Sequence, residues 1–402
     1  MKSMTAPMLA LYAVSTVTSY VAFSFFLSQQ ASGFLGSGGV IQQAVPTPDP
    51  SNRIVIAPDA PKTEECPLNG KYYTVAERES WDTRRPLAVM IENHLDARPQ
   101  SGLIKADVVY EAVVEGGITR FMPMYYCEVQ AKDTLVAPVR SARQAFIDWA
   151  SEYNMPLYVH VGGSNGEDTD PRVRGLEHLA DYGWTLRNDL NQFSIGAPTF
   201  IRNYDRIAGK DIATEHTMES STERLWALGV KRGYTNTSPD TKVKGKIVEG
   251  KDWREAFTPW KFADDKAEKG SVNSISYEFW SGYPDQAVRW EYDPSTNEYK
   301  RFMGGQAHLD LETGKQISAK NVIVQVAKEE FSVDIHHHNF IKTSSSGKAY
   351  LFANGEAQEI NWSKKNRESR TVFTDAKGKD VAFARGMVWI SVVNDKSDKP
   401  SY

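Results

Sequence analysis

The feature that most constrains this chain is its uncharged N-terminal stretch. No charged residue lies between Ala6 and Leu27, and Lys2 stands just before it. A helix needs about 20 apolar residues to cross a bilayer, so this stretch is long enough. Lys2 lies on the N-terminal side of the stretch, and the next Lys or Arg on the other side is Arg53. This charge asymmetry predicts a cytoplasmic N-terminus. We therefore predict that residues 1–28 are a signal anchor, a single transmembrane helix in the cell membrane, with the bulk of the chain extracytoplasmic.

Two alternatives to a retained anchor remain open. Ser and Thr residues dilute the apolar stretch, and a cleaved signal peptide is the first alternative. A cut after Gly33 places Ala31 and Gly33 at the small-residue positions, and the protein is then secreted. A buried core helix is the second alternative. No cysteine directly follows the stretch, so a lipid cannot be attached there.

Composition bounds the kind of protein. A formal net charge of −4 without a basic stripe argues against a nucleic-acid partner. Hydrophobic residues make up 41% of the 402 residues, which is ample for folded cores and allows two or three domains. Cys66 and Cys127 can form one disulfide outside the cell, and the loop-like surroundings of Cys66 favour the bond. Two unpaired thiols are the alternative.

The chain divides into a linker and two predicted domains. Residues 29–62 are rich in Pro, Gly and Ser and predict an extended linker. In residues 63–235, strand-like runs and a hairpin alternate with helical patterns, including an apolar face on residues 141–153. This pattern predicts an α/β domain, a layered sandwich with a mixed sheet and hairpins.

A polar connector and a second domain are expected to follow. Residues 236–270 are rich in Lys, Asp and Thr, as at a domain boundary. In residues 271–402, strand-like runs are separated by turn sequences such as Asn354-Gly355 and Lys377-Gly378. We predict a smaller, mostly β C-terminal domain.

The most suggestive candidate site is the segment PVRSAR, which predicts a strand-to-helix junction with Ser141 as the N-cap. Arg140 and Arg143 add positive charge where the helix end is already positive. That arrangement makes sense if a phosphate or carboxylate binds there. The alternative is that these arginines pair with protein carboxylates, for which the candidates are Glu92, Asp107, Glu111 and Glu115.

Two further elements extend this candidate site. The segment His160-Val161-Gly162-Gly163-Ser164 predicts a strand end where glycines let the backbone approach a ligand, although a plain turn also explains it. Arg120 follows a Gly-Gly turn near Glu115, where a cross-strand ion pair is the alternative.

Other motifs give weaker hypotheses. His216 could move a proton, but a surface or capping histidine is the alternative. On a strand, neighbouring residues point to opposite faces, so only His336 and His338 of the histidine run could share a metal. No Cys or His partner has zinc-site spacing, so we expect no metal and no cofactor. Trp280, like three other tryptophans of the C-terminal part, could stack on a sugar or pack in the core. The sequence contains no nucleophile elbow, Walker loop or dinucleotide fingerprint.

Several sequence segments, taken in their order along the chain, resemble those of a known family. RPLAVMIENHLDARPQSGL, ADVVYEAVVEGGITRF, PVRSAR and HVGGS are followed by RWEYDPSTNEYKRF and GKAYLFANGEAQEINWSK. Together they resemble the YerB-like family of bacterial envelope lipoproteins, whose function is uncharacterised. The resemblance implies an α/β N-terminal domain, a β-rich C-terminal domain and an extracytoplasmic location. This chain departs from the family in lacking a lipobox cysteine, and it reads Glu215-His216-Thr217 where the family has Pro-His-Asn.

Three functional hypotheses follow. The first is a membrane-tethered binding module that holds an anionic or glycan envelope ligand, or a partner protein, at Arg140 and Arg143. The second is an enzyme acting on phosphate-linked envelope polymers, with Asp107 or Glu111 as a metal ligand or base. Its support is a loose similarity of arrangement to LytR–CpsA–Psr phosphotransferases, which hold a polyprenyl pyrophosphate with arginines. The third is a structural scaffold in an envelope assembly.

Overall fold

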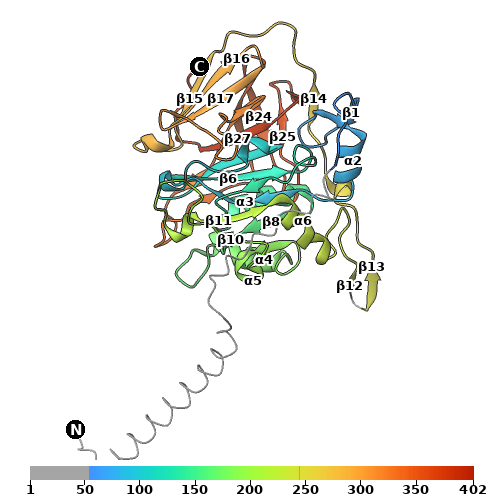
Figure 1. Ribbon diagram of the computed structural model, residues 1–402. Coiled ribbons are helices and arrows are strands. Elements are labelled where there is room, and N and C mark those ends of the chain that lie inside the picture. Colours follow the sequence, from blue (N-terminus) through green and yellow to red (C-terminus); the bar gives the residue numbers. More distant parts are fainter. Residues whose placement is uncertain (1–53, 244) are drawn as a thin grey trace, which may run out of the picture. The chain divides into compact units, whose positions relative to one another are not determined.

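The computed structural model describes residues 54–243 and 245–402 (Figure 1). The predicted anchor and most of the predicted linker lie outside these residues. Among the residues described, none of the helices combines the length and the apolar character that a membrane crossing requires. The described chain is mixed α/β, and strands predominate.

One 11-stranded sheet forms the centre of the fold. Its strands, in spatial order, are β25 (Val372–Thr374), β24 (Glu356–Ser363), β23 (Ser346–Ala353), β20 (Asn321–Ala327), β27 (Val388–Asn394), β5 (Val108–Glu115), β6 (Ile118–Tyr125), β3 (Leu87–Val89), β8 (Leu157–His160) and β9 (Asp189–Asn191), with β4 (Ile91–Glu92) beside β6. The predicted hairpin is β5 and β6, paired antiparallel.

The two segments predicted as separate domains share this sheet. Strand β27, from the end of the chain, pairs in parallel with β5, with Val388 opposite Val108 and Ile390 opposite Tyr110. On its other side β27 pairs in parallel with β20. The C-terminal segment therefore continues the sheet that the N-terminal segment begins.

Both faces of the central strands are buried, which explains their nearly continuous apolar sequences. On β5, Val108, Tyr110 and Ala112 contribute to one core cluster, whereas Val109 and Val113 contribute to the other. This alternation follows from the two-residue period of a strand. Each face of the sheet thus has its own hydrophobic core.

Helices are short and lie against both cores. They are α2 (Val75–Trp81), α3 (Gln144–Ala150), α4 (Gly175–Asp181), α5 (Gln192–Ile195) and α6 (Thr222–Lys231). Phe146 and Trp149 of α3 belong to the first cluster, and Leu225 and Trp226 of α6 belong to the second. The prediction that Ser141 caps the helix after the arginines was wrong. Helix α3 begins at Gln144, and its N-cap residue, Arg143, makes no side-chain capping bond.

A second sheet packs on the α6 side of the central sheet. It contains β15 (Ser274–Tyr277), β16 (Val288–Asp293), β17 (Glu298–Met303) and β18 (Gln306–Ala307), with β19 (Ser318–Ala319) beside β17. Alternate residues of β16 are buried, and Trp290 on that strand joins the second core. These strands lie side by side near the C-terminus in Figure 1.

The remaining strands form small sheets of two or three strands. They are β1 (Lys62–Glu65) with β2 (Tyr72–Thr74), β10 (Ile201–Arg202) with β11 (Met218–Ser221) and β7 (Leu135–Val136), β12 (Thr241–Val243) with β13 (Lys246–Val248), β14 (Lys261–Ala263) with β26 (Ala382–Ala384), and β21 (Glu329–Glu330) with β22 (Phe340–Ile341). The polar segment 236–270 contributes Trp253, which is fully buried against Tyr126. Part of the predicted connector is therefore packed against the first core.

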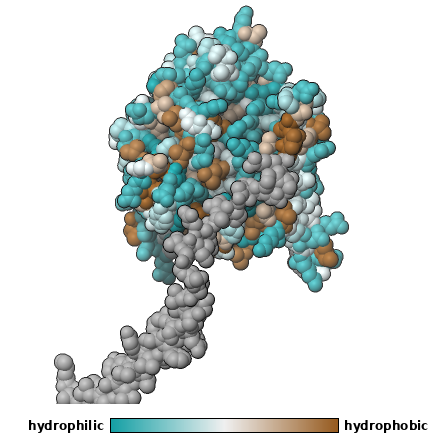
Figure 2. All heavy atoms as spheres, in the orientation of Figure 1, coloured by the Kyte–Doolittle hydropathy of each residue, from teal (hydrophilic) through white to brown (hydrophobic). Residues whose placement is uncertain are grey.

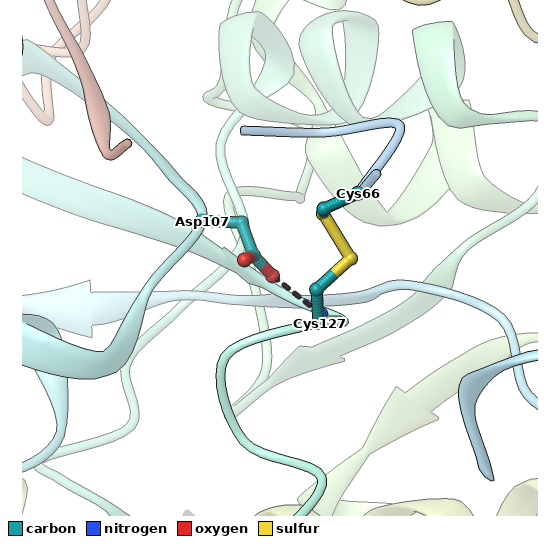
Figure 3. A group of neighbouring side chains, drawn as sticks. All are labelled: Cys66, Asp107 and Cys127. Carbon is teal, nitrogen blue, oxygen red and sulfur yellow. Dashed lines mark hydrogen bonds between the residues drawn. A yellow bond between two sulfur atoms is a disulfide. The ribbon is translucent and has the colours of Figure 1, made fainter. Parts of the chain in front are cut away.

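A disulfide joins Cys66 to Cys127, which is the one of the two open alternatives that the sequence slightly favoured (Figure 3). The Asp107 carboxylate lies beside it and accepts the backbone N–H groups of Tyr126 and Cys127 at 2.7 and 2.8 Å. Burial raises the pKa of Asp107 to about 7, although these hydrogen bonds favour its charged form. Asp107 thus organises the turn that follows β6.

Hydrophilic residues dominate the face of the molecule shown in Figure 2. Hydrophobic residues are scattered over it singly or in small groups. Scattered apolar residues of this kind are normal on a soluble surface.

Candidate functional site

Arg140 lies where three chain segments meet. Its backbone N–H donates to Met90 O at 2.8 Å, and its carbonyl accepts from Val161 N at 3.1 Å. These bonds fix the segment between the end of β3 and the end of β8. The Arg140 side chain is 27% exposed, and its Nε lies 2.9 Å from Glu92 Oε2. The Nε–H group is not directed at that oxygen, so the contact is an ion pair rather than a hydrogen bond.

The outer part of the Arg140 guanidinium remains available. Neither of its terminal nitrogens makes a hydrogen bond to any residue that the structure describes, and neither is buried. An arginine presents its donors in a fixed fork that suits carboxylate and phosphate groups. This pair of donors is therefore chemically suited to a bidentate anion contact.

Glu92 connects Arg140 to His216. Strand β4 places Glu92 in register with Arg120 of β6, and the carboxylate is almost completely buried. His216 Nδ1 lies 2.9 Å from Glu92 Oε2. Burial raises the pKa of Glu92, but His216, Arg120 and Arg140 together hold it below its usual value. Glu92 is therefore an anion shared by three cationic or donor groups.

His216 keeps one ring nitrogen free. Its Nδ1 faces Glu92, whereas its Nε2 makes no hydrogen bond to any residue that the structure describes. The His216 ring stacks on His94, with ring centres 5.1 Å apart and planes 12° apart. The sequence left His216 as either a proton carrier or a surface or capping histidine, and it did not place His216 beside Arg140. It missed His94, although His94 stands only two residues after Glu92 in the phrase IENH.

Arg143 and Arg120 are engaged by one carboxylate. Arg143 contacts both oxygens of Glu115 at 2.7 and 2.8 Å, and Arg120 Nη2 contacts Oε1 at 2.7 Å. Arg120 also donates to Ser141 O at 2.9 Å. Burial raises the pKa of Glu115, but the two arginines more than offset this and lower it to about 2. Here the structure has the internal ion pairs that the sequence left as the alternative, so these two arginines have little capacity for a ligand.

The histidine run borders this ion-pair group. The backbone of His338 forms an isolated antiparallel β-bridge with that of Glu115. The His338 Nδ1 atom lies 2.8 Å from Asp334 Oδ2. Residues His336 and His337 are exposed in a turn, so the strand that the metal hypothesis required is not present there. Burial lowers the pKa of His338 despite the nearby carboxylate of Asp334.

The segment from His160 to Ser164 is built into the interior. The His160 ring is fully buried, with Nδ1 2.6 Å from Gly162 O and Nε2 2.5 Å from Asp189 Oδ1. A Cβ at Gly163 would lie 2.9 Å from the Leu176 side chain. Ser164 Oγ accepts from Gly175 N at 3.1 Å. The polar atoms of His160 and Ser164 already have protein partners, which serve chain packing, and the ligand contact at these residues stays a prediction.

The two acids proposed for the enzyme hypothesis lie elsewhere. Asp107 accepts bonds beside the disulfide and is fully buried. Glu111 is also fully buried and pairs with Arg301 of β17. Neither carboxylate contacts Arg120, Arg140 or Arg143, so the expected convergence of acids and arginines was wrong for these two residues.

Two groups of side chains have metal-type donors. One atom from each of His94, Asp96 and His216 lies within 4.8 Å of the others. However, His94 Nδ1 accepts the N–H of Asp96 at 3.2 Å, and the Lys210 ammonium lies 3.7 Å from Asp96 Oδ1. These contacts occupy donors that a cation would need. In the other group, around Asp107, both sulfurs are in the disulfide and offer no thiolate.

Comparisons with known proteins agree with the fold. Two family models match, described as "Protein of unknown function (DUF3048) N-terminal domain" over residues 74–235 and its C-terminal domain over residues 276–390. The "Putative lipoprotein YerB" of Bacillus subtilis (strain 168) is 29% identical over 342 residues, which cover 84% of this chain and 88% of that protein.

A solved structure extends the likeness to three dimensions. The crystal structure of the YerB protein from Bacillus subtilis superposes with a TM-score of 0.64 at 26% identity, covering 85% of this chain and all of that one. Because the match covers 85% of this chain, it includes parts of both the N-terminal and the C-terminal segments. Matched by both models along most of its folded length, this chain belongs to the YerB-like DUF3048 family.

Proposed function

We propose that this protein is an extracytoplasmic, membrane-tethered binding module that holds an anionic group of an envelope ligand at Arg140. The location is supported by the apolar segment 6–27, the disulfide and the relative named as a lipoprotein. The chain lacks a lipobox cysteine, so in this proposal the helix replaces the lipid as the anchor.

The observation that carries the binding proposal is the unshared donor pair of Arg140. Arg120 and Arg143 both pair with Glu115, whereas Arg140 shares Glu92 with His216, and neither of its terminal nitrogens makes a hydrogen bond to a described residue. His216 adds no second donor in its neutral form, because its Nδ1–H donates to Glu92 and Nε2 is then an acceptor. A phosphate or carboxylate oxygen is the chemical group that suits the two terminal donors of Arg140.

The two other hypotheses have less support. The enzyme hypothesis relied on Asp107 or Glu111, which are buried apart from the arginines. A scaffold is favoured by a large exposed apolar patch, and the face in Figure 2 shows only scattered hydrophobic residues.

The binding test uses the purified full-length protein and inorganic pyrophosphate or citrate in isothermal titration calorimetry. Wild type should bind at least one of the two anions, and Arg140→Ala should weaken that binding at least tenfold. The matched control is Arg78→Ala, which removes another partly exposed arginine held by Glu64 and Asp82. Equal affinity in wild type and Arg140→Ala, or no binding of either anion, contradicts the proposal.

The tethering test is separate. Full-length protein should stay with the membrane pellet after alkaline carbonate extraction, and a variant lacking residues 1–28 should not. External protease should digest the full-length chain in intact spheroplasts. Release by carbonate, or protection from protease, contradicts the proposed topology.

A further inference from the structure

A cavity lies in the C-terminal segment, between the second sheet and the end of the chain. Its volume is about 900 Å³. Residues of β15 and β16, the loop around Trp280, Phe331 and residues 394–401 line it. This size is within the range of small-molecule sites. None of the residues in the predicted arginine site lines this cavity.

Aromatic rings form one wall of the cavity. Trp280 is partly exposed, and its ring lies 4.8 Å from that of Phe331, which is 42% exposed. Trp280 Nε1 donates to Glu329 Oε2 at 3.4 Å, and the ring also contacts Tyr283 at 5.8 Å. These contacts hold the indole in place while one side faces the cavity. An exposed, fixed aromatic surface of this kind suits the C–H face of a sugar ring.

The cavity also carries unpaired positive charge. Three basic and two acidic side chains line it, and two of the basic ones are Lys396 and Lys399. Both lysines are exposed, and neither forms an ion pair with a residue that the structure describes. Lys396 Nζ lies 5.6 Å from the centre of the Phe331 ring, so a cation borders the aromatic wall.

Hydroxyl groups complete the lining. The side chains of Ser276, Ser281 and Ser332 make no hydrogen bond within the described residues. A lipid chain gains little from such a polar lining, whereas sugar hydroxyls can pair with it.

Hydrogen bonds hold the remaining wall, formed by residues 394–401, in place. Ser276 and Ser401 exchange both backbone hydrogen bonds at 2.8 and 2.9 Å. Asn394 Nδ2 and Ser397 Oγ donate to Phe279 O at 3.2 and 3.0 Å. The cavity is therefore formed without a ligand, which lowers the entropy cost of binding.

We propose that this cavity binds an acidic saccharide, with a sugar ring stacked on Trp280 beside Phe331 and its acidic group at Lys396 and Lys399. The site is independent of the anion contact proposed at Arg140.

The test is calorimetric titration of the full-length protein with trigalacturonate, and with maltotriose as the neutral comparison. Trigalacturonate should bind more than tenfold tighter than maltotriose. Trp280→Ala should weaken trigalacturonate binding at least tenfold, and Trp280→Phe should restore most of it. A Lys396→Ala/Lys399→Ala variant should weaken binding and flatten its salt dependence. Lys261→Ala, an exposed lysine paired with Asp380, is the matched control and should change nothing.

Each alternative result is decisive. Failure of both saccharides to bind, or equal binding of the acidic and neutral trimers, overturns the proposal. So does trigalacturonate binding that survives both Trp280→Ala and the double lysine variant. If Trp280→Ala fails to fold, the exposed lysine variant alone decides. Arg140→Ala should leave trigalacturonate binding intact, which separates this site from the proposed anion contact.

Discussion

Arg301 of β17 donates to both carboxylate oxygens of Glu111 on β5, at 2.8 Å each, and both side chains are fully buried. Trp389 Nε1 of β27 donates to the same carboxylate at 3.0 Å. The residues come from the second sheet and from both halves of the central sheet. This buried pair therefore ties the N-terminal segment to the C-terminal one.

We predict that Glu111→Gln lowers the free energy of unfolding by about 3–5 kcal/mol, because it leaves the Arg301 charge buried without its partner. Glu111→Leu/Arg301→Met removes both charges. Its loss of unfolding free energy should be much smaller than the losses of Glu111→Leu and Arg301→Met added together. Urea unfolding followed by circular dichroism measures both values. Additive losses in the double variant would show that the two side chains are not coupled.

Glu115→Gln should remove an acid-sensitive contribution to stability. The folded pKa of Glu115 is about 2, below the unfolded value of roughly 4.3. The stabilisation is therefore complete above pH 4.3 and disappears as the pH falls towards 2. At pH 7 we expect a loss of about 2–3 kcal/mol, less than for a sealed pair because the carboxylate is 27% exposed.

The measurement is the difference in Tm between wild type and Glu115→Gln from pH 7 to pH 2. That difference should shrink as the pH falls towards 2, because Glu115 becomes protonated in the wild type. The other carboxylates titrate in both proteins, so their effect cancels in the difference. A difference that stays constant down to pH 2 would assign no ionic role to Glu115.

Local patterns were sufficient to predict much of the fold. The β5–β6 hairpin follows from alternating apolar residues around Gly116-Gly117, and the turn at Asn354-Gly355 follows from its sequence. What local patterns could not predict is the parallel pairing of β27 with β5. Those strands are nearly 280 positions apart, and no short-range signal encodes their contact.

The candidate site shows the same limit. The sequence indicated that Arg140 and Arg143 could bind an anion or pair with carboxylates, and it named both partners, Glu92 and Glu115, among four acids. It could not tell them apart, because which acid faces which arginine depends on strand register. It could not bring His216 to Glu92 either, since 124 positions separate them.

Glu329→Gln should stabilise the protein at alkaline pH but not at acidic pH. Burial raises the pKa of Glu329 to about 7, and its Oε1 has no hydrogen-bond partner among the described residues. The unfolded value is roughly 4.3, so the folded state holds the proton more tightly. Stability from this group is therefore full below pH 4.3 and is lost as the pH rises through 7.

Thermal unfolding at pH 4 and pH 8 measures this effect. Glu329→Gln should have a higher Tm than wild type at pH 8, which corresponds to a gain on the order of 1–3 kcal/mol in the free energy of unfolding. At pH 4 the variant should have no advantage. Glu330→Gln, at the exposed neighbouring position, is the control. An equal difference at both pH values would contradict a buried, titrating Glu329.

Reduction of the Cys66–Cys127 bond should destabilise the protein strongly. The bond closes a loop with a sequence separation of 61, and the chain-entropy model gives about 4 kcal/mol for a loop of that length. Wild type with and without dithiothreitol should therefore differ clearly in urea midpoint. A Cys66→Ala/Cys127→Ala variant should resemble the reduced protein and ignore dithiothreitol. Because both cysteines are fully buried, free thiols are counted in the unfolded, unreduced protein. A free thiol found there, or an unchanged urea midpoint on reduction, would contradict the bond.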